Sequence, residues 1–224
     1  MTADLKYPRD FPWITPYNPF ASSRIATDYV SQHQTTCRRM DRYVKNLLKR
    51  LLKAFSPAHS ILEVGCGTGH FSRWFAGQGL RAIGLDFSWP MLAQARHSKS
   101  LSLLQGDALR LPFKSASFDL LALIATLEFI PNPDQVLHEA IRIARQGLIL
   151  LVVNAQSRLG RQCKRQEDAI WEVTQLFTLT ELRHLIQEVV GKKPKILWQT
   201  SRPFWTESSP FVWGDFIGLA VKLY

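Results

Sequence analysis

A short apolar run that leads into three closely spaced glycines constrains this chain most. Residues 61–69 read Ile-Leu-Glu-Val-Gly-Cys-Gly-Thr-Gly, which predicts a buried strand running directly into a G-x-G-x-G loop. Glycine adopts positive φ at little steric cost and lets a ligand approach the backbone closely. The next segment, 71–76, has helical spacing, and a helix N-terminus offers free N–H groups to a polar or negative ligand. The stretch therefore predicts a strand–loop–helix unit that binds a small molecule.

Strands and helices alternate along the centre of the chain. Apolar strand-like runs are predicted at 60–64, 81–85, 101–104, 118–125 and 148–153. Helical spacing is predicted at 71–76, 91–96 and 133–145. Alternation of this kind is typical of βαβ units, whose mainly parallel sheet is covered by helices on both faces.

The tail of the chain departs from this alternation. A helix is predicted over 180–190, with Thr180 as its N-cap and Glu181 in its first turn. Two further strand-like runs follow at 195–199 and 216–222. They would add an antiparallel pair to one edge of the sheet.

The N-terminal part divides into an arm and a helix. Pro8, Pro12, Pro16 and Pro19 exclude a helix over residues 1–20 and indicate an arm. Residues 35–55 carry apolar side chains at amphipathic helical spacing. The opposite face of this helix is rich in lysine and arginine, which we interpret as a solvated face rather than a phosphate-binding stripe. We therefore predict an arm and helical cap over 1–56 and one larger domain over 57–224.

Composition restricts the type of binding partner and the cellular compartment that we expect for this chain. The chain has 28 Lys and Arg against 18 Asp and Glu, a net charge of +10, which attracts anions such as nucleic acid, acidic lipid or a phosphorylated substrate. Cys37, Cys66 and Cys163 lie far apart, which argues against a disulfide framework and fits a reducing compartment. The N-terminus lacks an apolar signal region, and no apolar run is long enough to cross a bilayer. We expect a cytoplasmic protein.

The loop spacing restricts the type of ligand. A dinucleotide-binding loop reads G-x-G-x-x-G, and its third glycine would fall at His70. The chain also has no G-x-x-x-x-G-K-[ST] phosphate loop and no G-x-S-x-G nucleophile elbow. An acidic residue, Asp86, ends the strand that follows the loop. The pattern thus argues against NAD and leaves the identity of the ligand open at this point.

Several motifs occur in the order seen in a known family. The stretch ILEVGCGTG resembles the first motif of class I S-adenosylmethionine-dependent methyltransferases, of the small-molecule, methyltransferase-11-like type. AIGLDFSWPML resembles the acidic second motif, LLQGDALRLPF the third, and SFDLLALIATLEFIP the fourth strand with its following turn. GLILLVVN resembles the fifth strand, and the resemblance is strong from about Ile61 to Asn154. Phe129 departs from it, because many small-molecule members carry histidine at this point.

The resemblance implies a Rossmann-like, doubly wound sheet of seven strands, mainly parallel with an antiparallel C-terminal strand, plus the N-terminal helical cap. It also implies S-adenosyl-L-methionine as the cofactor. Asp86 would bind the ribose hydroxyls, Phe87 would stack on the adenine and Asp107 would bind the adenine amino group. The full set of cofactor-binding residues that it implies is Glu63, Gly65, Cys66, Gly67, Gly69, Asp86, Phe87, Met91, Asp107, Ala108, Ile124 and Ala125.

The methyl acceptor is less constrained than the cofactor. The fourth strand lacks the Asn/Asp-Pro-Pro-aromatic signature of base-amino methylation, and no Cys follows a Pro, so a small-molecule acceptor is the leading hypothesis. RNA, or a lipid or quinone at an anionic membrane surface, is the alternative, as is a non-catalytic binding module. If a general base is needed, Tyr29 and His33 are the candidates, with Glu128 and His138 considered beside them. We expect the segment from Phe11 to His33 to cover the acceptor, with Trp205 to Trp213 in the tail as the second candidate.

Overall fold

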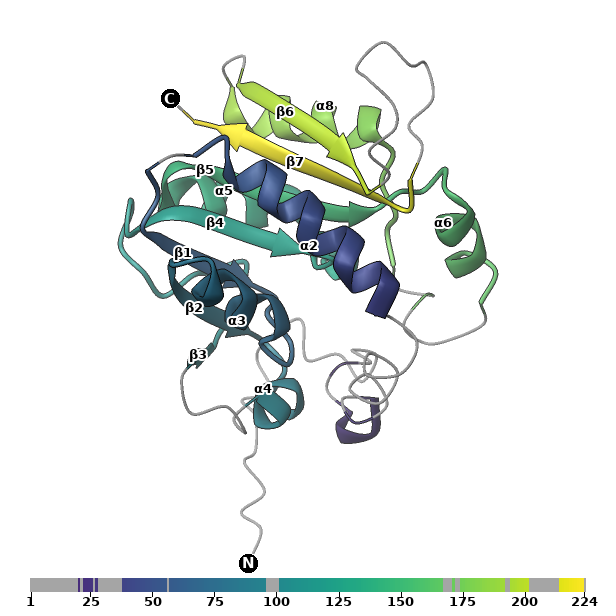
Figure 1. Cartoon of the computed structure of the whole chain (residues 1–224), viewed down its shortest axis with the longest axis horizontal. Coiled ribbons are helices and arrows are strands. Elements are labelled where there is room, and N and C mark those ends of the chain that lie inside the picture. Colours follow the sequence, from purple (N-terminus) through teal and green to yellow (C-terminus); the bar gives the residue numbers. More distant parts are fainter. Residues whose placement is uncertain are drawn as a thin grey trace, which may run out of the picture.

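The computed structural model describes residues 20, 22–25, 27, 38–55, 57–95, 101–166, 171, 174–191, 194–201 and 214–223. These residues form a seven-stranded sheet with the strand order β3-β2-β1-β4-β5-β7-β6 (Figure 1). The strands are β1 (Ser60–Val64), β2 (Arg81–Asp86), β3 (Ser102–Gln105), β4 (Phe118–Ile124), β5 (Ala144–Val153), β6 (Lys195–Thr200) and β7 (Phe216–Lys222).

The first five strands are parallel, and β7 is antiparallel to both β5 and β6. The expected seven-stranded sheet with a reversed C-terminal strand is thereby confirmed. The chain crosses from β3 at one edge back to β4 beside β1, so the strand order reverses between β1 and β4. In open α/β sheets, ligands bind at such a switch point, outside the carboxyl ends of the strands.

Helices cover both faces of the sheet. On one face lie α2 (Arg38–Leu52) and α3 (His70–Gly77), and on the other lie α5 (Pro133–Ile143) and α8 (Leu179–Val190) (Figure 1). The shorter elements are α4 (Trp89–Ala95), the 3₁₀ turn η2 (Leu127–Phe129) and α6 (Arg158–Cys163). Two buried clusters of aliphatic and aromatic side chains, one on each face, form the core.

The predicted start of α8 and the predicted boundary between α5 and β5 were wrong. Thr178, not Thr180, caps α8, because its hydroxyl accepts from the Glu181 N–H while the Glu181 carboxylate accepts from the Thr178 N–H, a reciprocal capping box. The helix predicted to end at 145 ends at Ile143, and β5 begins at Ala144 instead of Leu148. Ala144 already pairs with Phe118 of β4, so tertiary pairing overrides the helical spacing there.

The amphipathic helix predicted at 35–55 is observed as α2, and its apolar face belongs to the core. Leu47 and Leu48 of α2 are fully buried. Glycines in the strands beneath let the helix approach closely, since a Cβ at Gly218 would lie 2.8 Å from Leu51 Cδ1. The division of the chain at residue 56 stays a prediction.

A methyl group at Gly147 tests this close packing. Its Cβ would lie 2.2 Å from the Val221 carbonyl oxygen and 2.5 Å from the ring of Phe55. We expect Gly147→Ala to lower the free energy of unfolding by about 2–3 kcal/mol, because backbone and ring must both move. Urea denaturation monitored by circular dichroism measures the change.

The matched control is Gly77→Ala in α3, where a Cβ would meet nothing within 4 Å. This variant should keep or slightly raise the stability, because alanine favours helix. Equal stability of Gly147→Ala and the parent chain would contradict the packing argument.

Candidate functional site

The loop after β1 lies at the switch point and has left-handed backbone at each of its glycines. The φ angles are 73° at Gly65, 53° at Gly67 and 71° at Gly69, in the region where a side chain is unfavourable. A Cβ at Gly65 would lie 2.1 Å from Cγ2 of Thr126, which follows β4. The loop therefore requires glycine both for its conformation and for its contact with the neighbouring strand end.

Asp86 holds this loop from the end of β2. One carboxylate oxygen accepts from the Gly67 N–H at 2.6 Å, and the other accepts from the Ser88 N–H at 2.7 Å. Burial raises the pKa of Asp86, and the two N–H donors act in the opposite direction. Each oxygen keeps a lone pair, so this carboxylate can still accept hydrogen bonds from a ligand with adjacent hydroxyls.

Glu63 is buried beneath the loop, within β1. Its carboxyl group accepts from the hydroxyl of Ser72 in α3. Burial raises the pKa of Glu63 to about 8, with Asp86 adding to the rise, so Glu63 is largely protonated at neutral pH. Burial also raises the pKa of the Cys66 thiol, which keeps it in the neutral form. We infer that both residues shape the loop from below.

The ends of β2 and β3 bring further predicted residues near the loop. Asp107 follows β3 and accepts from the Leu109 N–H at 2.9 Å, while the Gln105 amide donates to the Phe87 carbonyl at 3.1 Å. The Cε of Met91 would lie 3.2 Å from a Cβ at Gly67. The structure thus gathers residues from β1, β2 and β3 at one edge, as the sequence predicted.

The end of β4 carries backbone strain. Ala125 has a φ of 49°, a left-handed conformation that is uncommon for a residue other than glycine. Its N–H donates to the Leu151 carbonyl at 2.8 Å, and the next hydroxyl, of Thr126, donates to Gly65 O and Ile124 O. Strained residues of this kind are common at ligand sites. That Ile124 and Ala125 line the pocket stays a prediction.

Glu128 lies in the turn η2, three residues after Ala125. Its side chain is buried, and Oε1 accepts from the Val153 N–H at 2.7 Å. Among the described residues, no donor lies within hydrogen-bonding distance of Oε2. Burial raises the pKa of Glu128 to about 7, so neutral and ionised forms coexist near neutral pH.

Part of the N-terminal arm reaches the same edge. The Ser88 hydroxyl donates to the Phe20 carbonyl, and the Phe20 ring packs edge-to-face on Phe129 at 5.1 Å. The predicted catalytic residues Tyr29 and His33 lie outside the described residues, as does most of the segment from Phe11 to His33. Their roles stay predictions.

The helix α2 is tied to the end of the glycine loop. His70, which stands where a dinucleotide loop has glycine, makes a hydrogen bond of 2.6 Å from Nε2 to Asp41 of α2. Lys45 donates to the other oxygen of the same carboxylate at 2.8 Å. The helix is therefore coupled to the site even though it covers a face of the sheet.

Sequence reasoning missed Ser88, Thr126 and Phe20 as parts of this edge. Ser88 could have been identified from the sequence, because a serine directly before a predicted helix is a typical N-cap. In the structure its hydroxyl accepts from the Met91 N–H at the start of α4. Thr126 and Phe20 had no such signal, because their contacts join segments that are distant in the sequence.

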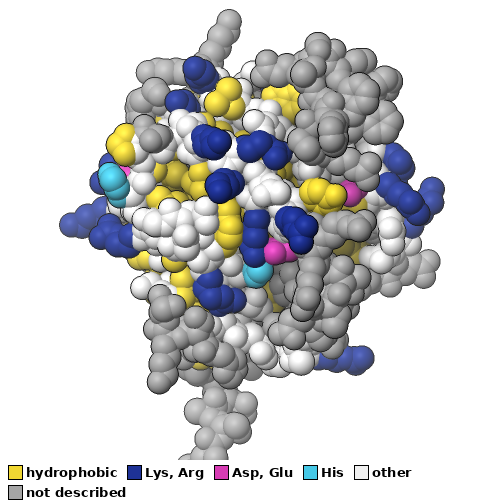
Figure 2. All heavy atoms as spheres, viewed as in Figure 1, with side chains coloured by type: hydrophobic (Ala, Val, Ile, Leu, Met, Phe, Trp, Pro, Cys, Tyr) yellow, Lys and Arg dark blue, Asp and Glu magenta, His cyan; other side chains and the backbone are white. Residues whose placement is uncertain are grey.

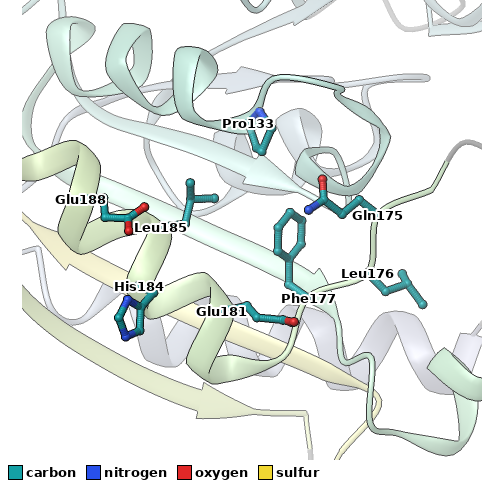
Figure 3. Close-up of a pocket in the computed structure, with 8 residues that line it drawn as sticks. All are labelled: Pro133, Gln175, Leu176, Phe177, Glu181, His184, Leu185 and Glu188. Atoms are coloured by element: carbon teal, nitrogen blue, oxygen red, sulfur yellow. The ribbon is translucent and has the colours of Figure 1, made fainter.

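A separate cavity of about 300 Å³ lies between α5 and α8 (Figure 3). Phe177 and Leu185 give it an apolar lining, and Glu181, His184 and Glu188 project from α8 around it. None of the residues predicted to bind the cofactor lines this cavity.

Within the described parts of the chain, no three His, Cys, Asp or Glu side chains are grouped to hold a metal ion, and no helix is long and apolar enough to cross a membrane.

The comparisons with known proteins agree with this geometry. Residues 62–152 match the family model described as a methyltransferase domain, and this range contains the glycine loop, Asp86 and Glu128. A solved S-adenosylmethionine-dependent methyltransferase of Thermotoga maritima superposes with a TM-score of 0.69 over 91% of this chain and 99% of that one, at 22% identity. Residues 62–152 therefore match a methyltransferase domain, and the described residues have the class I methyltransferase fold.

The curated relatives of this methyltransferase domain act on different acceptors. A malonyl-[acyl-carrier protein] O-methyltransferase of Pectobacterium atrosepticum is 37% identical over 106 residues, which are 46% of this chain and 42% of the relative. A demethylmenaquinone methyltransferase of Renibacterium salmoninarum is 32% identical over 129 residues, 57% of this chain and 52% of the relative. The chain thus spans about half the length of these two relatives.

The buried carboxyl of Glu63 predicts how the stability of the methyltransferase domain depends on pH. Because the pKa of Glu63 is raised to about 8, the folded chain binds this proton more tightly than the unfolded chain. The resulting stabilisation is complete below the pKa of the unfolded carboxyl and is lost as the pH rises towards 8. Glu63→Gln should therefore flatten the fall in unfolding free energy between about pH 5 and pH 8.

Urea denaturation at several pH values measures this slope. Glu181→Gln is the control, because the Thr178 N–H and hydroxyl lower the pKa of Glu181 and keep it ionised throughout the window. Identical slopes for Glu63→Gln and the parent chain would show that the Glu63 proton is not retained on folding.

Proposed function

We propose that the chain binds S-adenosyl-L-methionine at the switch point and transfers its methyl group to a small-molecule acceptor. The observation that supports this most is the left-handed glycine loop held by Asp86. In this arrangement the Asp86 oxygens accept from the two ribose hydroxyls, and the loop from Gly65 to Gly69 cradles the methionine part. Phe87, Met91, Asp107 and Ala108 surround the adenine, while Ile124 and Ala125 line the pocket near the sulfur.

The residues present fit this cofactor. Gly65, Gly67 and Gly69 leave backbone free of Cβ atoms where a ligand must approach closely. Asp86 supplies a carboxylate for a diol, and the loop leads straight into α3, whose N-terminus faces the same space. When bound, the cofactor supplies an electrophilic sulfonium methyl group. The protein's part is to orient the acceptor in line with the S–CH₃ bond and to exclude water.

The acceptor is proposed to be a small molecule rather than a macromolecule. The alternative is RNA or an anionic membrane surface, and the exposed basic side chains of α2 support it. Figure 2 shows lysines and arginines spread over the visible face of the molecule. Arg42 and Lys49 of α2 are exposed, as is Lys53 directly after the helix. Basic side chains on a helix whose apolar face is buried are commonly solvated, so charge alone does not favour this alternative.

Replacing Asp86 tests the cofactor assignment. Asp86→Ala removes two charge-assisted hydrogen bonds, each worth roughly 1.5–3 kcal/mol. Affinity for S-adenosylhomocysteine, measured by calorimetry, should fall well over tenfold, while circular dichroism shows an intact fold. Asp134→Ala, an exposed carboxylate on α5, is the control and should bind as the parent does. Unchanged affinity of Asp86→Ala, or binding of NAD in place of the S-adenosyl ligand, would contradict the proposal.

The basic face gives a second test. If α2 only carries a solvated charge, the chain should bind RNA weakly, with affinity falling steeply as salt increases, because phosphate contacts release counterions. A fluorescence-anisotropy titration of a structured RNA at physiological salt measures this. Tight, structure-specific binding that Arg42→Glu with Lys49→Glu abolishes would instead favour the RNA alternative.

A further inference from the structure

Three aromatic rings from distant parts of the chain meet at the carboxyl end of β4. Phe20 packs edge-to-face on Phe129 with centroids 5.1 Å apart, and Phe129 packs on Trp171 at 6.3 Å with a tilt of 46°. All three residues are half-buried. Each residue is therefore partly exposed, at the edge of the sheet where the acceptor must lie.

The contacts of Phe20 connect segments that follow two different strands of the sheet. Its carbonyl oxygen accepts from Ser88, which follows β2, and its ring contacts Phe129, which follows β4. Since β1 lies between β2 and β4, the contacts of this residue span two strand spacings, roughly 10 Å, across the end of β1. Phe20 therefore joins the segments that follow β2 and β4, the two strands on either side of the strand that leads into the glycine loop.

A buried polar side chain belongs to the residue directly before Phe129 in the chain. The Glu128 carboxyl precedes Phe129 in the chain, and the Glu128 carbonyl accepts from the Gln175 N–H at 2.8 Å, four residues after Trp171. Oε1 is satisfied by Val153, but no donor in the described part of the chain reaches Oε2. Native proteins seldom leave a buried carboxyl oxygen unpaired, and such exceptions call for an explanation, such as a ligand group.

We propose that Phe20, Phe129 and Trp171 form a subsite for a planar aromatic acceptor, whose ring hydroxyl or N–H group donates a hydrogen bond to Glu128. Flat ring faces bind planar ligands by stacking and edge-to-face contact, which a saturated ring of the same size cannot match. The single buried oxygen then selects, among planar rings, those that carry a donor. This subsite rests on the proposed function, since the acceptor must lie beside the bound cofactor.

The test measures binding of three probes to the full chain saturated with S-adenosylhomocysteine. The probes are 1-naphthol, its saturated analogue decahydro-1-naphthol, and 1-methoxynaphthalene, which lacks the donor. Titrations at pH 8, followed by ligand-observed NMR, keep Glu128 mostly ionised, since burial raises its pKa to about 7. We expect 1-naphthol to bind at least tenfold more tightly than either other probe.

Single substitutions test which side chains contact the bound 1-naphthol. Phe129→Leu and Trp171→Leu should each weaken 1-naphthol binding about five- to tenfold, whereas Tyr43→Leu, an exposed aromatic on α2, should not change it. Glu128→Gln keeps an oxygen for Val153 but presents an N–H in place of Oε2. It should therefore bind 1-naphthol and 1-methoxynaphthalene about equally.

Two failures are distinguishable. A chain that does not bind S-adenosylhomocysteine contradicts the proposed function itself. If the chain binds S-adenosylhomocysteine, three results each overturn the aromatic subsite alone. These are no binding of any probe, equal binding of 1-naphthol and its saturated analogue, and unchanged 1-naphthol binding in the Phe129 and Trp171 variants. Unchanged preference for 1-naphthol in Glu128→Gln overturns the role of the buried carboxyl.

Discussion

The hydrogen bond from the Gly67 N–H to the Asp86 carboxylate is the contact on which the candidate site depends. It joins the loop after β1 to the end of β2, and the Ser88 N–H fixes the second oxygen of the same carboxylate. Ser88 then connects to Phe20 through its hydroxyl. One buried carboxylate thus sets the position of the loop, the start of α4 and the point where the arm crosses the sheet edge.

The parts of the site that follow one strand could be predicted from the sequence. Asp86 was identifiable because it ends an apolar run that follows a glycine loop, and parallel strands place their ends at one edge. Two contacts could not be identified from the sequence, because each joins distant parts of the chain. Thr126 and Gly65 are separated by 61 positions, and Phe129 and Phe20 by 109 positions. The start of β5 was missed for the same reason, since pairing with Phe118 outweighs local helical spacing.

Two buried glutamates at this edge have different surroundings. Glu63 lies under the glycine loop with a hydroxyl partner, while Glu128 has one oxygen bonded and one without a partner among the described residues. Burial raises the pKa of both, to about 8 and about 7. The protonated form of Glu63 places no second full charge near Asp86, which leaves that carboxylate as the principal negative group of the loop.

The strained backbone at Ala125 explains why these features meet in one place. Its positive φ turns the chain sharply after β4, so that Thr126 contacts Gly65 and the turn η2 directs Glu128 towards the end of β5. An extended residue there would continue the strand and separate the glycine loop from the aromatic rings. The cost of this conformation is offset by the Ala125 N–H bond to Leu151 and by the Thr126 hydroxyl bonds. The strain therefore positions the cofactor loop and the proposed acceptor subsite together.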